Sequence, residues 1–137
     1  LFAGGIAIAS AFVQSGLAEI IAQELGALAS LPTWLLILSV CLAVTFLTEV
    51  TSNTATASLL MPVLAVTAGA TGISPMLLMV PAVMSASCAF MLPVATAPNA
   101  IVFGSGKVSI RQMARAGFVL NLIGAVVITG VSLLMLE

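Results

Sequence analysis

The chain has 137 residues, of which 62% are hydrophobic and only 5% are charged, and its formal net charge is −1. A soluble domain carries about 25% charged residues, so this composition excludes a water-covered globular surface and indicates an integral membrane protein. The chain contains no histidine and no strongly basic patch. It therefore lacks the usual metal ligand and general base, and nucleic-acid binding is not expected.

Residues 1–30 fall into two parts. Residues 1–15 are apolar and rich in small side chains, which predicts the end of a spanning helix packed closely against a neighbour. In residues 16–29, Glu19 and Glu24 alternate with leucine and isoleucine at helical spacing, which predicts a short amphipathic helix along the membrane interface. The chain starts inside an apolar stretch without an initiator methionine, and we expect it to be the C-terminal part of a longer chain.

Residues 31–68 hold two apolar runs separated by a polar stretch. The first run covers residues 32–50 and the second covers 55–68. Crossing the hydrocarbon core takes about 20 helical residues, so the roughly 14 residues of the second run are too few. We therefore predict a re-entrant helical hairpin over 31–68 with its tip at residues 52–54.

Residues 74–106 contain a second interruption. An apolar run at 75–92 is followed by the polar stretch 93–99, which begins with Pro93, and then by a short apolar piece at 100–103. Irregular backbone is tolerated at membrane depth only inside protein or beside a wet cavity. The pattern predicts a broken transmembrane helix over 74–106 and a final spanning helix over 110–136.

All basic residues of the chain lie between positions 105 and 115; they are Lys107, Arg111 and Arg115. Basic residues near membrane ends favour the cytoplasmic side. We therefore expect residues 105–115 to be cytoplasmic and the C-terminus to lie outside.

The two polar interruptions have the chemistry of a small-ion site. Ser52 or Asn53 can cap the helix that starts near Thr54, and Thr96 can cap the helix that starts near Pro98. Each helix would then direct its free backbone amides and positive dipole end at the interruption, where they can bind an anion without lysine or arginine. A cation would supply the missing charge; hard oxygen donors suited to Na⁺ are the hydroxyls of Thr48 and Thr51, the side-chain oxygen of Asn53 and the carbonyl of Ala95.

Some of these polar residues have a simpler interpretation. Serine and threonine in membrane helices often donate to a carbonyl one turn earlier, but polar side chains this dense beside a helix break favour a binding site. Glu49 is the only ionisable residue deep in the predicted membrane region. It either takes part in function or holds the loop through hydrogen bonds. No nucleophile–base pair or metal-ligand cluster is present, so an enzyme is not expected.

The interruptions resemble those of a known family. Residues 48–57 read TEVTSNTATA and residues 91–106 read MLPVATAPNAIVFGSG, and both runs are similar to the divalent anion/sodium symporters. The resemblance covers nearly the whole chain and would place it in the C-terminal half of such a protein. It implies an all-α, polytopic membrane protein with a re-entrant helical hairpin and a broken transmembrane helix, forming half of an inverted-repeat transporter.

The resemblance also implies roles for individual residues. Substrate contacts would fall on Ser52, Asn53, Thr54, Thr96 and Ala97, the last standing where the family often has proline. A sodium site between the interruptions would use Thr48, Thr51, Asn53 and Ala95, and structural support of the site would come from Glu49, Pro98 and Asn99. The family's second Ser-Asn-Thr lies in the N-terminal half, which is missing here. Family members are homodimers that move substrate by an elevator-like shift.

The resulting prediction is sodium-coupled symport of a C4-dicarboxylate such as succinate by alternating access across the bacterial inner membrane, with Na⁺ as the co-transported ion. Two alternatives remain open. The cargo could be sulfate, citrate or another oxyanion. Alternatively, the chain could be a non-transporting scaffold or channel subunit whose polar interruptions only mediate helix contacts, in which case Asn53→Ala and Thr96→Ala would disturb assembly alone.

Overall fold

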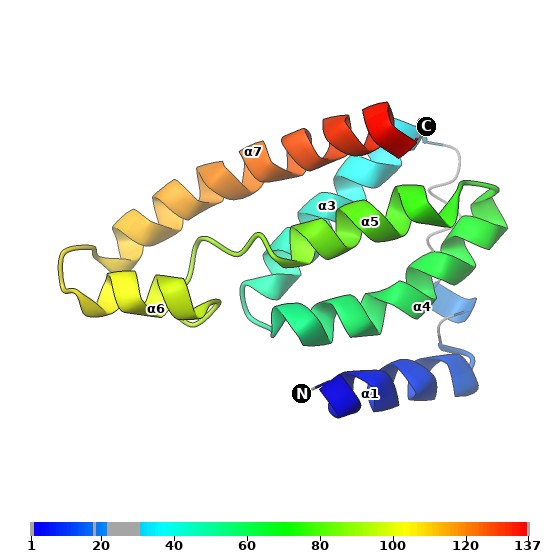
Figure 1. Cartoon of the computed structure of the whole chain (residues 1–137), viewed down its shortest axis with the longest axis horizontal. Helices are drawn as coiled ribbons and strands as arrows, with labels where there is room; N and C mark the ends of the chain where they lie inside the picture. The colour runs from blue at the N-terminus through cyan, green and yellow to red at the C-terminus, as the bar shows by residue number, and fades with distance from the viewer. Residues whose placement is uncertain (1, 18, 22–30, 137) are drawn as a thin grey trace.

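The computed structural model describes residues 2–17, 19–21 and 31–136, and the regular structure in these ranges is helical (Figure 1). The helices are α1 (Phe2–Gln14), α3 (Thr33–Thr48), α4 (Asn53–Thr71), α5 (Pro75–Ala86), α6 (Ala97–Gly104) and α7 (Ile110–Leu136). The all-α expectation is confirmed for this part of the chain. The amphipathic helix expected at 16–29 lies largely outside the described residues.

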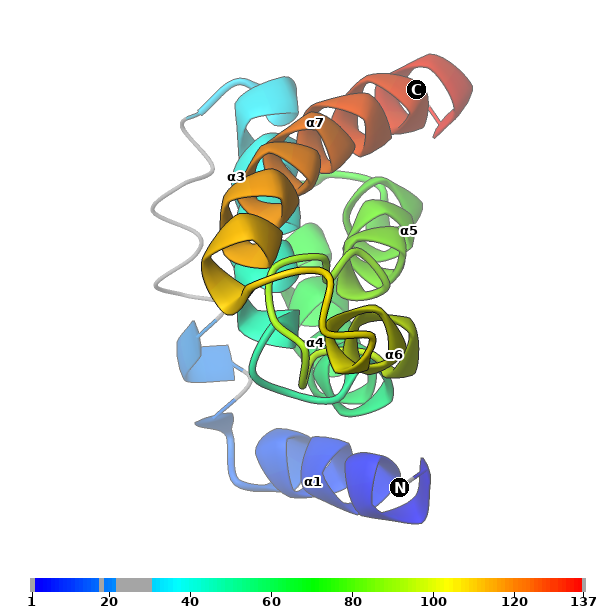
Figure 2. The same cartoon turned by 90° about the vertical axis from the view of Figure 1, so that its left-hand side faces the viewer.

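Helices α3, α5 and α7 pack against one another, with α4 on the other side of α5 and α1 against α4 (Figures 1 and 2). The chain runs towards one end in α3, returns in α4, and comes back to the same end in α5. Because α3 and α5 end at this same end, the turn after α3 and the connection after α5 come close together (Figure 1). Helix α6 lies beneath the start of α7 at this end (Figure 1).

The core is formed where α3, α5 and α7 meet, with α4 closing its lower side. Its buried apolar side chains are Leu36, Ile37, Cys41, Val44, Leu64, Ala68, Leu77, Leu78, Ala82, Ala86, Ala125 and Ile128. Near one end of this core, the rings of Phe46 and Phe118 join α3 to α7 with their centroids 5.7 Å apart. Small residues at the helix contacts let the backbones approach closely, as is typical of helices packed in a membrane.

Helix α4 is longer than the sequence suggested. It has 19 residues and ends at Thr71; the following Gly72 is its C-cap, with a φ of 72° in the left-handed conformation. The expected length was wrong because polar residues at both ends belong to the helix: near its C-terminus the hydroxyls of Thr67 and Thr71 donate back to Val63 and Thr67. At a rise of about 1.5 Å per residue, α4 is about 28 Å long. A re-entrant path for it stays a prediction.

Helix α5 is shorter than the sequence suggested. It ends at Ala86 instead of Leu92, so residues 87–96 form the connection to α6, which begins at Ala97. The physical reason is a competing acceptor. The backbone amides of Phe90, Met91 and Leu92 donate to the carboxylate of Glu49 and are therefore lost to helical hydrogen bonding.

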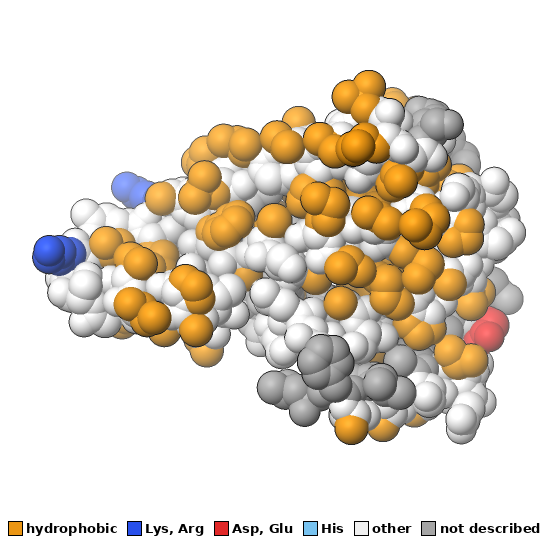
Figure 3. Space-filling view, viewed as in Figure 1, with side chains coloured by type: hydrophobic (Ala, Val, Ile, Leu, Met, Phe, Trp, Pro, Cys, Tyr) orange, Lys and Arg blue, Asp and Glu red, His pale blue; other side chains and the backbone are white. Residues whose placement is uncertain are grey.

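Helix α7 confirms the helix expected at 110–136. Among the described helices it is the one long and apolar enough to cross a membrane, with 27 residues and a mean hydropathy of 2.4 over its most apolar 18-residue stretch. Its outward side chains, including Ile123 and Val126, are exposed apolar groups, and hydrophobic side chains cover much of the visible face in Figure 3. The exposed basic side chains gather at the end where α6 joins α7 (Figure 3).

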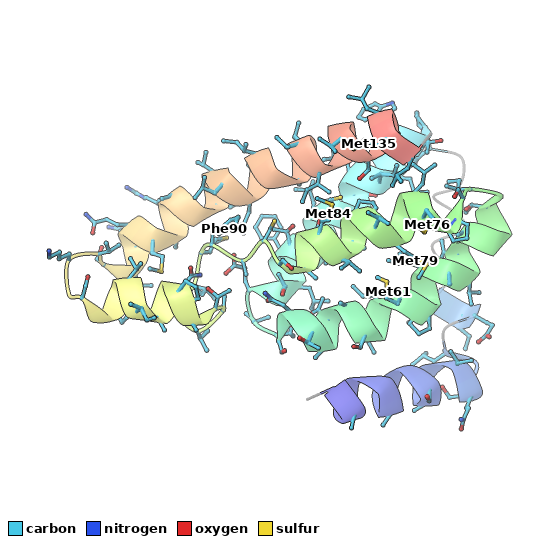
Figure 4. All side chains as sticks on the ribbon, viewed as in Figure 1. Met61, Met76, Met79, Met84, Phe90 and Met135 are labelled. Atoms are coloured by element: carbon cyan, nitrogen blue, oxygen red, sulfur yellow. The ribbon has the colours of Figure 1, made fainter. Side chains whose placement is uncertain are left out.

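Gly117 of α7 allows the connection 87–96 to lie against the helix. A Cβ atom at this position would stand 2.3 Å from the carbonyl oxygen of Phe90 and 2.6 Å from the Cα of Met91. Phe90 lies directly beneath α7 (Figure 4). Only glycine therefore permits this close approach of two backbones.

We expect Gly117→Ala to lower the melting temperature of the detergent-solubilised full-length protein, because such overpacking costs about 1–3 kcal/mol. Gly130→Ala in the same helix is the matched control, since a Cβ there meets no heavy atom within 4 Å. Equal melting temperatures for the two variants would contradict the close approach.

Candidate functional site

The two interruptions that the sequence singled out form opposite walls of one pocket. Its volume is about 480 Å³, and it is lined by Val50, Thr51, Ser52, Asn53, Val94, Ala95, Thr96 and Ala97. The first wall is the turn between α3 and α4, and the second joins the connection 87–96 to α6. The turn after α3 and the connection after α5 approach each other on the side of the helix bundle that faces α6 (Figure 1).

The first wall leads into the N-terminus of α4. Ser52 occupies the N-cap position in an extended conformation, but its side chain makes no capping hydrogen bond. The expected side-chain cap at Ser52 is therefore wrong, although the position is right. As a result the exposed Ser52 side chain lines the pocket without satisfying a backbone amide at the start of α4.

The second wall leads into the N-terminus of α6. Thr96 is the N-cap residue, and its hydroxyl oxygen accepts a hydrogen bond of 3.3 Å from the backbone amide of Asn99. The predicted cap is confirmed. Pro98 occupies the first turn, where its missing amide hydrogen is not needed.

The electrostatics of the pocket favour a small anion held by neutral groups. The positive ends of two helix dipoles, those of α4 and α6, border it. Among the described residues, no lysine or arginine lines it. Lys107 instead lines a separate cavity between α6 and α7, together with Phe90, Val102 and Gln112.

Beneath the first wall, Thr48 forms a cluster of oxygen atoms. Its buried hydroxyl lies 2.7 Å from Oδ1 of Asn53 and 2.9 Å from the carbonyl oxygen of Ala86. A hydroxyl carries one proton and both neighbours are acceptors, so one contact lacks a proton unless the Asn53 amide turns its Nδ2 towards Thr48. Three converging oxygens with one proton are suited to a hard cation.

The remaining predicted residues lie in different surroundings. The Thr51 hydroxyl donates to the carbonyl of Leu47 at 2.8 Å and contacts the hydroxyl of Thr56, so it is turned back along the helix although Thr51 lines the pocket. Ala95 lines the pocket, and its amide donates to the carbonyl of Leu92; sodium binding by the Ala95 carbonyl stays a prediction. Thr54 does not line this pocket; it lines another cavity of about 270 Å³, between the start of α4 and the end of α5.

Glu49 lies behind the pocket with 4% of its surface exposed. Its Oε1 accepts hydrogen bonds from the amides of Phe90 (2.7 Å) and Met91 (2.9 Å) and from Nδ2 of Asn121 (2.8 Å). Its Oε2 accepts from the amide of Leu92 (3.0 Å). The carboxylate therefore joins the end of α3 to the connection 87–96 and to α7.

Asn99 supports the same connection from the opposite side. Its Nδ2 donates to the carbonyl oxygens of Ala89 (2.9 Å) and Leu92 (3.0 Å). Leu92 is thus bonded through its amide to Glu49 and through its carbonyl to Asn99. The irregular backbone of residues 87–96 obtains from side chains several of the hydrogen bonds that a helix would have supplied.

Sequence reasoning missed Ala86, Gly117 and Asn121. Ala86 was placed inside a helix that was expected to continue to residue 92, where its carbonyl would have been occupied. Asn121 is the more instructive omission, because a polar amide in the middle of an apolar spanning helix is itself a signal of a buried partner. Its spacing of four from Gly117 puts both residues on one face of α7.

A polar pocket walled by two interrupted helical segments of an apolar chain is typical of membrane carriers. Comparison with known families agrees with this class. The family model described as the sodium:sulfate symporter transmembrane region matches residues 1–136, and the chain belongs to this family. The resemblance expected from residues 48–57 and 91–106 is thereby confirmed.

Named relatives carry a more specific description. The sodium-dependent dicarboxylate transporter SdcS of Staphylococcus saprophyticus is 50% identical over 128 residues, which cover 93% of this chain and 25% of the relative. The protein of that name from Staphylococcus aureus (strain USA300) is 52% identical over 128 residues, with the same two coverages of 93% and 25%. The chain therefore spans about a quarter of the length of these relatives. Their names describe transport and not an enzymatic reaction.

We expect Asn99→Asp to loosen the connection 87–96, because a carboxylate would face the two carbonyl oxygens that the amide now satisfies. Peptide-level hydrogen–deuterium exchange of the full-length protein should show faster exchange in residues 87–96. Gln14→Glu makes the same amide-to-acid change at an exposed site on α1 and should leave that exchange unchanged. Identical exchange in Asn99→Asp and wild type would contradict the supporting role of Asn99.

Proposed function

We propose that this chain is the C-terminal part of a bacterial inner-membrane carrier that moves a C4-dicarboxylate such as succinate into the cell together with Na⁺. One observation carries the proposal: two helix N-termini border a pocket without lysine or arginine, next to a buried cluster of oxygen atoms. The family description supports coupling to sodium, and the names of the relatives support both the sodium coupling and a dicarboxylate cargo.

The substrate contacts are proposed at Ser52, Asn53, Thr96 and Ala97. A pocket of about 480 Å³ falls in the usual range for small-molecule sites, about 300–1,000 Å³. One carboxylate of the substrate would accept hydrogen bonds from the Ser52 hydroxyl and from the amides of the first turn of α4. Thr54 is proposed to contribute only through the backbone at this helix start, since its side chain lies beside the cavity between α4 and α5.

The sodium ion is proposed to bind next to this carboxylate. Thr48 and Asn53 supply side-chain oxygens, and the carbonyl of Ala86 joins them. Thr51 and Ala95 would complete the coordination from the pocket walls. Because the substrate is an anion and no basic side chain lines the pocket, a bound cation lowers the electrostatic cost of placing the substrate there. Binding of the two ions is then mutually favourable.

The rest of the machinery lies in the remainder of the carrier. We propose that the N-terminal half supplies the other side of the pocket, that two copies form a homodimer, and that the site is exposed alternately to the two sides of the membrane. Residues 105–115 are proposed to be cytoplasmic and the C-terminus external, because the exposed basic side chains gather at one end of the molecule (Figure 3).

The direct test is uptake of labelled succinate by liposomes containing the full-length protein. We expect saturable uptake that an inward Na⁺ gradient accelerates and that replacement of Na⁺ by choline abolishes. Uptake that ignores the Na⁺ gradient would contradict sodium coupling.

The family description names sulfate, so sulfate is the alternative cargo with an observation in its favour. Sulfate and citrate should be tested as competitors in the same vesicles. If sulfate competes more strongly than unlabelled succinate, the transported anion is sulfate and not a dicarboxylate. The absence of saturable binding of any of these anions would contradict a carrier function.

We expect Thr48→Val to raise the half-saturating Na⁺ concentration for uptake by about tenfold, the equivalent of one lost contact to a charged group. Thr48→Ser keeps the hydroxyl and should stay near wild type. Thr67→Val is a control for burial alone, because Thr67 is buried in α4 and donates only to the carbonyl of Val63. An unchanged Na⁺ dependence in Thr48→Val would rule out the oxygen cluster as the sodium site.

A further inference from the structure

We propose that Glu49 is a positioning residue that fixes the two walls of the pocket relative to each other and to α7. This inference rests on the function proposed above, because it assigns Glu49 a part in substrate affinity without any contact to substrate or sodium. Glu49 does not line the pocket, and its two oxygens are already occupied by four donors.

The position of the carboxylate in the chain gives it control of both walls. The first wall begins at Val50, the residue directly after Glu49, and the second begins at Val94, close after Leu92. The carboxylate binds the amides of residues 90–92. Only one or two peptide units separate the carboxylate's attachment points from each wall. Because each residue has only two soft backbone dihedrals, so short a segment cannot absorb a displacement of Glu49, and the walls would move with it.

The bond to Asn121 closes a ring of connected segments. From the carboxylate the ring passes through the connection 87–96 into α6 and then into α7, and it returns to Glu49 through the fully buried Asn121. One turn before Asn121, Gly117 keeps the connection in direct contact with α7. Helix α6 is thus held from both sides in the chain: the connection before it is bonded to the Glu49 carboxylate, and α7 follows it.

The charge of Glu49 is essential to this role. An ionised carboxylate only accepts hydrogen bonds, so it can serve three backbone amides and one side-chain amide at once. A glutamine of the same shape carries one NH₂ group, which would face at least one of these donors. Glu49→Gln therefore keeps the volume of the side chain and removes at least one of the four bonds.

We expect Glu49→Gln in the full-length protein to raise the KM for succinate by about tenfold, the effect of one lost bond to a charged group. The kcat should change much less, because displaced pocket walls weaken binding equally in the ground state and in the transition state of transport. Asn121→Leu removes a single bond outside the pocket and should shift KM in the same direction by a smaller factor. Glu19→Gln at an exposed glutamate is the matched control and should behave as wild type.

The positioning role also has a readout that needs no transport. Spin labels at residues 50 and 94, whose valine side chains are 71% and 82% exposed, report the separation of the walls by pulsed electron paramagnetic resonance in a cysteine-free background without substrate. Glu49→Gln and Asn121→Leu should broaden or displace the distance distribution, and Glu19→Gln should not. If Glu49→Gln fails to fold, Asn121→Leu carries the test.

Two results would overturn the proposal. An unchanged distance distribution together with a raised KM would make Glu49 a direct ligand. An unchanged distribution and KM with only a lower melting temperature would make it a support of the fold alone. If wild-type protein shows no sodium-dependent uptake, the proposed function fails, and the spin-label distances still decide whether Glu49 positions the walls.

Discussion

The chain must satisfy the backbone polar groups of the irregular segment 87–96, which is only partly covered in this apolar membrane protein. A helix satisfies its own amides and carbonyls, but residues 87–96 leave the helical conformation. Membrane hydrocarbon offers no water to replace those hydrogen bonds. Side chains from other elements supply several of them instead: Glu49, directly after α3, accepts from backbone amides, and Asn99 of α6 donates to backbone carbonyls. Asn121 of α7 in turn donates to the Glu49 carboxylate. The second wall of the pocket can be irregular because side chains replace several of the hydrogen bonds that a helix would have supplied.

The neutral lining of the pocket follows from the same surroundings. A lysine or arginine placed there would itself be costly to bury when the substrate is absent. Helix N-termini provide partial positive charge that belongs to the backbone and needs no ionised side chain. A mobile cation can supply the remaining charge only when it is needed. In the proposed function, this division between fixed dipoles and a mobile ion would make sodium coupling a consequence of the electrostatics of the site.

Sequence reasoning located this site because the signals were local. Polar clusters at 48–54 and 93–99 interrupt strongly apolar runs, and both clusters line the pocket. The helix at 110–136 was found from its length and uniform hydropathy. The extent of α5 could not be found in this way, since residues 87–92 are as apolar as the helix before them. Their conformation is decided by Glu49, far away in the chain, and local propensity carries no information about such a partner.

None of the residues of α6 is buried in the described chain. In membrane hydrocarbon an exposed apolar helix keeps its own backbone hydrogen bonds, so α6 can stay helical although its neighbours in the described chain cover little of it. The second wall of the pocket is therefore carried by a helix whose position, more than its helical structure, depends on the contacts at its ends.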